Sequence, residues 1–267
     1  MVSERSDLDN RRGFDRAVDR YERARHGYPP SMFDDLFAML PAGCQVCEIG
    51  PGTGQATGDL LDRGASVTAV ELGTSMAQRL VARLGHHPGL VEVIKAPFED
   101  ARLPDDAYDA VFSATAYHWI PTWAQTTEPA RILHHGGVLA IVDSLQVDSP
   151  DDDGFWERVQ PIFDRHGAGR PPDDPPVEAP DEATPSMLAI LRVTDEFADV
   201  ELRRYRWDQH YTADQYGELH RTYSGWLAMP EADGEALLAD VCAFIDSDYA
   251  GHIVRPLVIT LLTARRL

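Results

Sequence analysis

The chain has 267 residues, of which 43% are hydrophobic and 25% are charged. These proportions exclude a membrane-embedded bundle and a disordered chain, and they are ordinary for a globular protein with a sizeable core. The formal net charge of −20 at pH 7 repels phosphate backbones and anionic lipid, so we expect neither nucleic acid nor a membrane as a partner. Three cysteines are too few for a disulfide framework, and the charged first residues do not resemble a leader peptide, so we expect a cytoplasmic protein.

The first half of the chain alternates predicted strands and helices. Residues 1–30 are polar and irregular in their apolar spacing, which predicts an N-terminal arm or lid. Beyond them, strands alternating with helices predict a parallel sheet that is covered on both faces. The predicted strands are 45–49, 66–71, 90–95, 108–114 and 138–142, and the predicted helices are 31–40, 57–62, 75–84 and 126–133.

The pattern changes after about residue 150. Residues 167–185 contain six prolines and many acids, which predicts an extended connector. Aromatic residues at alternate positions predict a strand over 200–211, and Thr212 with Gln215 predicts a capping box that opens a helix reaching Met229. The remaining predicted elements are helices at 155–166 and 235–245 and a strand at 252–264.

These elements predict an α/β protein with four regions. An N-terminal arm or lid covers residues 1–30, and a doubly wound sheet core covers 31–149. A substrate cap and connector cover 150–235. The last helix and strand, in 236–267, are expected to complete the core.

A glycine-rich turn follows the first predicted strand. Gly50, Gly52 and Gly54 leave the backbone bare, so a ligand can lie directly against it. A dinucleotide-binding turn would have a further glycine where this chain has Gln55, and the nearby carboxylate of Glu48 repels pyrophosphate. The turn therefore favours a positively charged nucleoside as its ligand.

A second acid, Glu71, ends the second predicted strand, where a carboxylate can accept hydrogen bonds from both hydroxyls of a ribose. The segment Glu48-Ile-Gly-Pro-Gly-Thr-Gly54, together with Val70-Glu71, resembles the first two motifs of the class I S-adenosylmethionine-dependent methyltransferases. Tyr117-His-Trp-Ile120 resembles the small-molecule branch, which includes trans-aconitate and ubiquinone-biosynthesis methyltransferases. The resemblance implies a Rossmann-like, doubly wound sheet of seven strands with the last strand antiparallel, and a helical cap.

The resemblance also implies S-adenosylmethionine as the cofactor and S-adenosylhomocysteine as its product. The glycines would lie under the methionine part, with Glu48 ordering the turn or the ammonium group and Glu71 binding the ribose. Pro97 stands where the family often has an adenine-reading Asp, so Phe98 and Glu99 are the candidates for adenine contact. The full set of implied cofactor-binding residues is Glu48, Gly50, Gly52, Gly54, Glu71, Leu72, Phe98, Glu99, Ser113, Arg25 and Tyr21.

His118, just past the fourth predicted strand, is the candidate general base, because a neutral imidazole can accept a proton from an attacking group. It could equally contact the cofactor carboxylate or brace its neighbour Trp119. Aromatic residues after the connector lie where the family places its substrate-covering elements, and most of them are expected only to pack. The candidate substrate contacts are Tyr28, Tyr117, Trp119, Tyr223 and Trp226. The sequence has no recognisable metal-ligand cluster, so we expect no metal.

The expected function is methyl transfer by in-line displacement to a small molecule, through an O-, N- or C-nucleophile, including a carboxylate. The alternative enzyme class is an NAD-dependent oxidoreductase, and Gln55 and Glu48 disfavour this class. A non-catalytic regulator that binds S-adenosylmethionine is the alternative without chemistry. The sequence leaves monomer and homodimer open.

Overall fold

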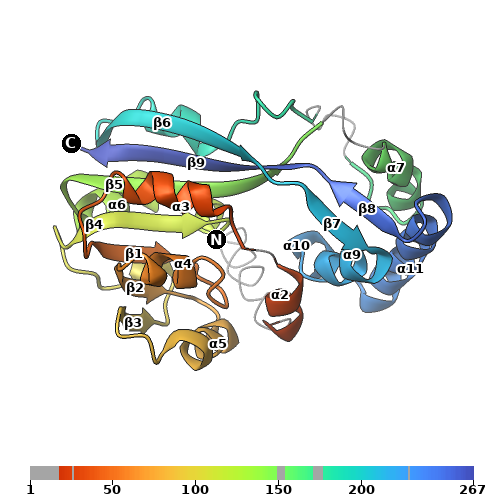
Figure 1. The fold of residues 1–267 in the computed structure, drawn as a ribbon, viewed down its shortest axis with the longest axis horizontal. Coiled ribbons are helices and arrows are strands. Elements are labelled where there is room, and N and C mark those ends of the chain that lie inside the picture. Colours follow the sequence, from red (N-terminus) through yellow and green to blue (C-terminus); the bar gives the residue numbers. More distant parts are fainter. Residues whose placement is uncertain (1–17, 26, 149–153, 171–176, 228) are drawn as a thin grey trace.

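The computed structural model describes residues 18–25, 27–148, 154–170, 177–227 and 229–267. Within them, a sheet core and a smaller helical lobe are joined by a long β ribbon (Figure 1). Most of the predicted arm, residues 1–30, lies outside the described residues.

The core is a seven-stranded sheet in the order β3-β2-β1-β4-β5-β9-β6. Strands β1 to β5 are parallel, whereas β9 is antiparallel to both β5 and β6. The predicted Rossmann-like sheet with an antiparallel last strand is therefore confirmed. The bounds are β1 (Gln45–Ile49), β2 (Ser66–Val70), β3 (Leu90–Ile94), β4 (Tyr108–Ala114), β5 (Leu133–Gln146), β6 (Phe197–Arg206) and β9 (Leu257–Arg266).

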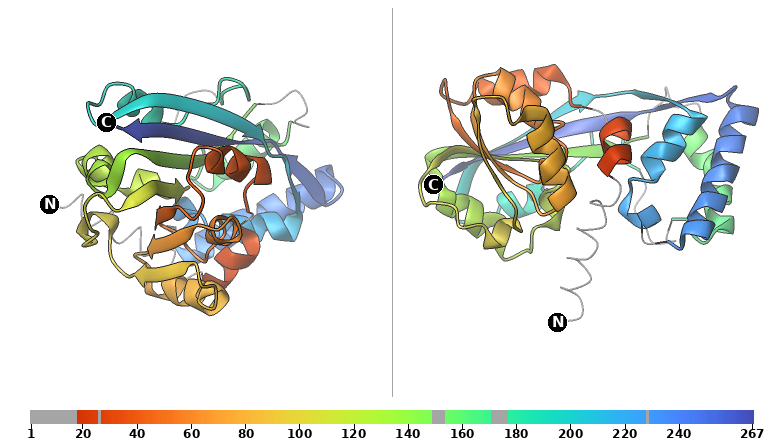
Figure 2. Two further views of the ribbon diagram at one scale, coloured as in Figure 1. Left: turned by 60° about the vertical axis from the view of Figure 1, so that its left-hand side comes forward. Right: turned by 90° about the horizontal axis from the view of Figure 1, so that it is seen from below.

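Helices cover both faces of this sheet (Figure 2). Alternate strand residues point to opposite faces, so Val46 packs in one apolar cluster and its neighbour Cys47 in the other. Burial on both faces explains why the central strands are nearly continuous apolar runs. One face carries α3 (Pro30–Phe37), α4 (Thr57–Asp62) and α5 (Thr74–Leu84). The other carries η2 (Phe98–Asp100), η3 (Tyr117–Trp119), α6 (Ala124–Ile132) and α8 (Met187–Leu191).

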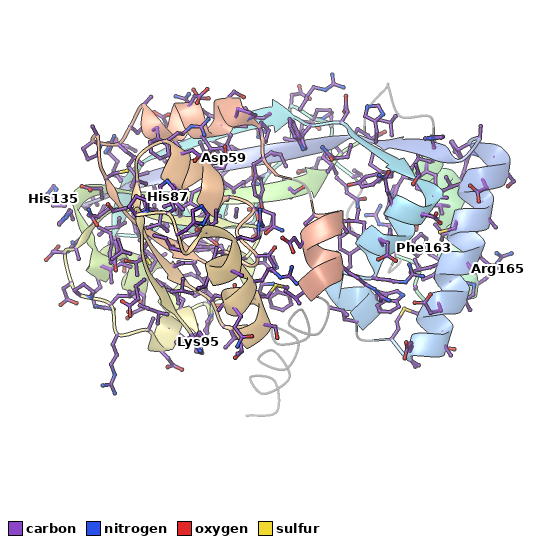
Figure 3. All side chains as sticks on the ribbon, turned by 60° about the horizontal axis from the view of Figure 1, so that its bottom comes forward. Asp59, His87, Lys95, His135, Phe163 and Arg165 are labelled. Carbon is purple, nitrogen blue, oxygen red and sulfur yellow. The ribbon has the colours of Figure 1, made fainter. Side chains whose placement is uncertain are left out.

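The helical lobe has an apolar core of its own, in which Phe155, Tyr216, Val241 and Ile245 are buried together. Its helices are α2 (Val18–Ala24), α7 (Phe155–Arg165), α9 (Ala213–His220), α10 (Ser224–Leu227) and α11 (Glu231–Asp248). A two-stranded ribbon of β7 (Gln209–Thr212) and β8 (His252–Arg255) connects it to β6 and β9. Helix α2 lies on the side of the lobe that faces the core. In Figure 3 the lobe carries the labelled Phe163 and Arg165, and the core carries the labelled His87 and His135.

The structure corrects the boundaries of the predicted regions. Strand β6 and helix α8 belong to the sheet core, although residues 150–235 were predicted to form a cap. Helix α11 packs on α7 and α9 instead of completing the core, because its buried face meets the lobe. The cap is therefore built from α2 and from two separated stretches of chain, one containing α7 and the other running from β7 to β8.

Several predicted elements are also subdivided. The strand predicted over 200–211 is β6 followed by β7, and the strand predicted over 252–264 is interrupted at Pro256, which cannot donate to a strand ladder. The helix expected to reach Met229 is α9 followed by α10. The capping box of Thr212 and Gln215 is confirmed at the start of α9. In the predicted connector, residues 171–176 lie outside the described residues, but Ala183 is buried beside β5 and β9.

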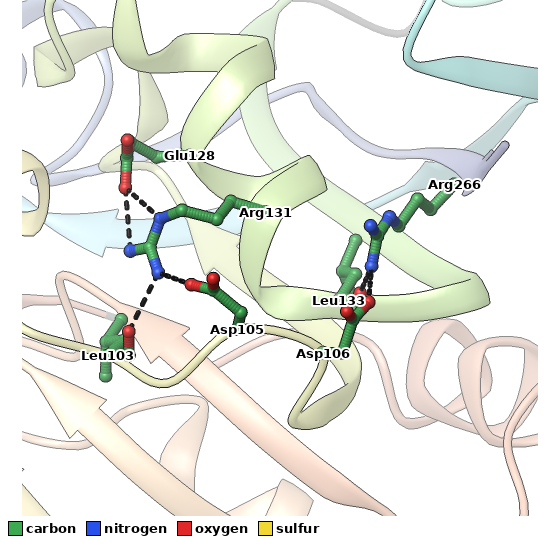
Figure 4. A network of polar contacts seen from close by, with 7 residues as sticks. All are labelled: Leu103, Asp105, Asp106, Glu128, Arg131, Leu133 and Arg266. Carbon is green, nitrogen blue, oxygen red and sulfur yellow. Dashed lines mark hydrogen bonds and ion pairs between the residues drawn. The ribbon is translucent and has the colours of Figure 1, made fainter.

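Two arginines fasten the edge of the core at which β4 begins (Figure 4). Arg131 on α6 donates to Glu128, to Asp105 and to the carbonyl of Leu103. Arg266, at the end of β9, contacts Asp106 and the carbonyl of Leu133. These contacts lie at the amino end of β4, so the opposite, carboxyl edge of the parallel strands is left for a ligand.

Candidate functional site

The glycine turn after β1 uses its glycines for different purposes. Gly50 has φ +64°, and a Cβ atom there would lie 2.4 Å from the Cβ of Ala116, so only glycine lets the two loops approach. Gly52 also has a positive φ, +59°. Gly54 has φ +93°, and a Cβ there would lie 2.7 Å from Leu80 of α5. Gly50 and Gly52 line a cavity, whereas Gly54 seats a helix.

Glu71 follows directly after β2 and is only 8% exposed. Its Oε2 accepts a hydrogen bond of 3.0 Å from the Gly52 N–H, and its Oε1 accepts one of 2.7 Å from the Gly73 N–H. The carboxylate thereby ties the glycine turn to the start of α5. Charge-assisted bonds of this kind are stronger than bonds between neutral groups, so Glu71 holds the turn in shape.

A cavity of about 520 Å³ opens beside this turn, at the carboxyl edge of β1, β2, β4 and β5. This volume lies within the usual range for sites that hold small molecules and cofactors. Of the residues that the sequence assigned to the cofactor, its wall contains Gly50, Gly52, Glu71, Leu72, Phe98 and Arg25. Phe98 lies in η2 with its side chain buried, and Glu99 is absent from the wall.

A smaller cavity of about 80 Å³ lies between the sheet edge and the helical lobe. It shares Arg25, Gly50, Thr115 and Tyr223 with the larger cavity. Tyr28 also lines it, with its hydroxyl 3.2 Å from the Thr115 Oγ1. The two cavities therefore meet where the lobe closes over the glycine turn.

Glu48 lies at the floor of the smaller cavity and is 1% exposed. Its Oε2 has no hydrogen-bond partner among the described residues. Burial raises the pKa of Glu48 to about 8, because a desolvated carboxyl disfavours its charged form. At neutral pH its carboxyl is therefore mostly protonated and can donate as well as accept a hydrogen bond.

Arg25 directly follows α2 and lines both cavities. Its Nε donates to the Thr222 Oγ1 at 3.1 Å, and its guanidinium lies 4.9 Å from the centre of the Tyr223 ring. These contacts fix a positive charge on the wall that the two cavities share. The side chain of Tyr21, which was predicted beside it, lies outside the described part of the structure.

His118 and Trp119 come from η3 and line the larger cavity. Their ring centres are 5.0 Å apart. Desolvation lowers the pKa of His118 from its ordinary value of 6.5, so the imidazole is neutral at pH 7 and has a nitrogen able to accept a proton.

Four predicted site residues have other positions. Ser113 is fully buried, and its hydroxyl donates to the Ile49 carbonyl at 3.0 Å, which joins β4 to β1. Tyr117 is buried with its hydroxyl on the Gln125 carbonyl. Trp226 packs against Gly234 of α11, where a Cβ would lie 2.6 Å from its Nε1. Together with Glu99, these side chains are absent from the walls of both cavities.

Sequence reasoning missed Asp143, which lines the larger cavity from β5. It directly follows the apolar run 138–142 at the carboxyl end of a parallel strand. The same position on β2 had identified Glu71, so the signal was present. Thr115, with φ +54°, was also missed, and it lines both cavities.

The fold and the site together define a class of protein, namely a Rossmann-like sheet with a cavity at its carboxyl edge. The family profile described as "Methyltransferase domain" matches residues 47–141. An uncharacterised methyltransferase of Mycobacterium tuberculosis is 39% identical over 130 residues, which are 48% of this chain and 51% of that protein. Over residues 47–141 the chain is thus similar to the methyltransferase domain family. It spans about half the length of the curated relatives it matches.

Solved structures agree on the fold. A structure described as a type II methyltransferase of Anaeromyxobacter dehalogenans matches with a TM-score of 0.62 and 24% identity, covering 91% of this chain and 96% of that one. A phosphoethanolamine N-methyltransferase of Haemonchus contortus, in complex with phosphomonomethylethanolamine and S-adenosylhomocysteine, matches with a TM-score of 0.56 and 16% identity. It covers 99% of this chain and 60% of that one. The closer resemblance to trans-aconitate methyltransferases stays a prediction.

Two further findings bear on partners. No helix within the described ranges is long and apolar enough to cross a membrane. Among the same residues, no group of three or more His, Cys, Asp and Glu side chains is arranged to hold a metal ion.

Proposed function

We propose that the protein transfers the methyl group of S-adenosylmethionine to a small-molecule acceptor. One observation carries this proposal. Glu71 holds the backbone of Gly52 and Gly73 while lining a cavity of about 520 Å³ at the carboxyl edge of the sheet. A fixed carboxylate beside bare backbone matches a ligand that presents a ribose and a positive charge.

The residues of the cavity fit the cofactor along its length. Gly50 and Gly52 leave backbone for the methionine part, and Arg25 supplies a positive charge for its carboxylate. Glu71 and the neighbouring Leu72 suit the ribose. Phe98 is on the cavity wall, which supports its assignment to the adenine where Pro97 departs from the family pattern.

The bound cofactor supplies a methyl group on a sulfonium, which is electrophilic without further activation. The protein then contributes orientation and exclusion of water. The helical lobe meets the sheet edge where the two cavities join, and Tyr223 of the lobe lies on the walls of both, so an acceptor can approach the larger cavity from this side. His118, neutral and on the cavity wall, is positioned to take a proton from an acceptor hydroxyl or amine.

The larger cavity extends from the glycine turn to β5, which favours an enzyme over a regulator that only binds the cofactor, because such a regulator needs no space for an acceptor. A single small molecule as the acceptor, either a monomeric or a homodimeric assembly, and a cytoplasmic location stay predictions.

Calorimetric titration of the full chain with S-adenosylhomocysteine and, separately, with NAD tests the proposal. We expect one binding site for S-adenosylhomocysteine and no heat with NAD at the same concentrations. Heat with NAD alone would replace the proposal with the oxidoreductase alternative. Absence of heat with either ligand would reject both.

A further inference from the structure

Asp143 is a carboxylate that directly follows the apolar run 138–142 of β5, three residues before this strand ends. Six residues before it on β5, Gly137 to Val142, are buried. Since strand side chains alternate, Asp143 faces the same side of the sheet as Leu139 and Ile141, which belong to the apolar cluster shared with Phe98 and Ile120. Its side chain therefore lines the larger cavity on this face of the sheet.

This carboxylate has no protein partner within the described ranges. No hydrogen bond and no ion pair links Asp143 to any described residue. Desolvation raises the pKa of Asp143 to about 6, with no neighbouring charge contributing to the shift. A carboxylate on a cavity wall that lacks hydrogen bonds from the protein is available to a ligand group. Glu71, on the same cavity wall, accepts one hydrogen bond from a backbone N–H group at each of its two oxygens.

The strand order places Asp143 at the acceptor end of the cavity. The glycine turn follows β1 and Glu71 follows β2, so the cofactor is expected over these two strands. Strand β5 lies on the other side, separated from β1 by β4. Two strand spacings amount to about 10 Å. About this distance therefore separates Asp143 from the glycine turn that would hold the cofactor. Asp143 would then face the acceptor, which lies beyond the transferable methyl.

The other charges around the cavity leave this end negative. Arg25 is positive, but it is held on the lobe side by Thr222 and Tyr223. His118 is neutral at pH 7, as its lowered pKa indicates. Trp119 lines the same cavity, and an aromatic ring attracts a cation. A cationic ligand group satisfies both the carboxylate and this ring.

We propose that Asp143 recognises a positively charged nitrogen of the acceptor, so that the substrates of this protein are amine-bearing small molecules. This inference rests on the proposed methyltransferase function. It makes Asp143 a residue that selects the acceptor, and it disfavours the carboxylate acceptor that the sequence had left open, because two carboxylates would repel each other there.

Matched probe pairs test this inference on the full chain saturated with S-adenosylhomocysteine. The pairs are ethanolamine with ethylene glycol, phenethylamine with 2-phenylethanol, and tryptamine with tryptophol, and 3-phenylpropionate serves as an anionic probe. Binding is measured by calorimetry or ligand-observed NMR. In at least one pair, the amine should bind about tenfold or more tightly than the alcohol, and the anionic probe should bind least.

The variant Asp143→Asn should lower the affinity for the preferred amine about 10- to 100-fold, as expected for loss of a charge-assisted hydrogen bond. The matched control is Asp62→Asn, which makes the same change on the exposed end of α4 and should bind the amine like the original protein. Equal affinities within every pair, preference for the anion, or an unchanged amine affinity in Asp143→Asn would overturn the inference.

The affinity for S-adenosylhomocysteine is measured first in every variant. If the original protein does not bind it, the proposed function fails. If the protein binds it without the Asp143-dependent amine preference, only the inference about the acceptor fails.

Discussion

Replacement of Glu71 by glutamine is expected to weaken cofactor binding sharply while leaving the fold intact. In the structure, the two carboxylate oxygens accept hydrogen bonds of 3.0 Å and 2.7 Å from Gly52 and Gly73. A glutamine amide has only one oxygen, so its NH₂ group must face one of these two N–H donors. The glycine turn then loses one of its two attachments to the loop after β2.

The magnitude follows from the strength of such bonds. A hydrogen bond to a charged group contributes about 1.5–3 kcal/mol. Glutamine also removes the charged acceptor that would face the ribose hydroxyls. Since each 1.4 kcal/mol corresponds to about tenfold in affinity, loss of that bond to the ligand predicts about 10- to 100-fold weaker binding of S-adenosylhomocysteine. The loss of one attachment of the glycine turn acts in the same direction, because a less ordered turn must be ordered when the ligand binds.

Isothermal calorimetry with S-adenosylhomocysteine measures this effect, and urea unfolding checks that the variant remains folded. The control is Glu92→Gln, which makes the same change at an exposed position of β3 in the same sheet. An affinity of Glu71→Gln within about twofold of the control would refute the role assigned to this carboxylate.

Three further predictions concern stability. Gly54→Ala should lower the free energy of unfolding by about 1–3 kcal/mol in urea titrations, because its Cβ would overlap Leu80 and its φ is positive. The control is Gly58→Ala, which should not destabilise the protein because nothing lies within 4 Å of the added Cβ. Glu48 stays protonated in the folded protein up to about pH 8 but ionises near pH 4.5 when unfolded. Unfolding therefore releases a proton, and the free energy of unfolding falls as the pH rises through that window. Relative to the original protein, the free energy of unfolding of Glu48→Gln should rise by at least about 1 kcal/mol between pH 5 and pH 8. Burial lowers the pKa of His220 to about 3, so stability falls as the pH drops below 6.5, and His220→Phe should show a smaller loss of Tm between pH 7 and pH 5.

Each of these three predictions has a contradicting outcome. Equal unfolding free energies for the two glycine variants would argue against close packing of the turn on α5. A pH dependence that persists unchanged in Glu48→Gln or in His220→Phe would show that the group in question does not titrate as its burial indicates.

The parts of the site that were predictable from sequence are those encoded by contiguous residues. A strand, a glycine turn and a helix follow one another within residues 45–62, so their geometry depends little on the rest of the chain. The role of Glu71 was equally predictable from the sequence, because the carboxyl ends of neighbouring parallel strands meet at one edge of the sheet. The same rule would have identified Asp143 if it had been applied to the fifth strand.

The parts that were not predictable depend on distant packing. Tyr117 lies beside His118 in the sequence, yet it is buried on Gln125 of α6 instead of facing the cavity. Trp226 follows the connector as expected of a covering residue, but Gly234 leaves a space on α11 that its ring occupies. Whether an aromatic side chain fills a core or faces a ligand is decided by such partners, which local periodicity does not reveal.

A crystal structure of the protein with S-adenosylhomocysteine tests the central claim most directly. The account predicts the ribose hydroxyls within hydrogen-bonding distance of Glu71, the amino-acid part against Gly50 and Gly52, and open space between the sulfur and Asp143. A ligand bound elsewhere, or a crevice closed by the protein's own side chains, would contradict it.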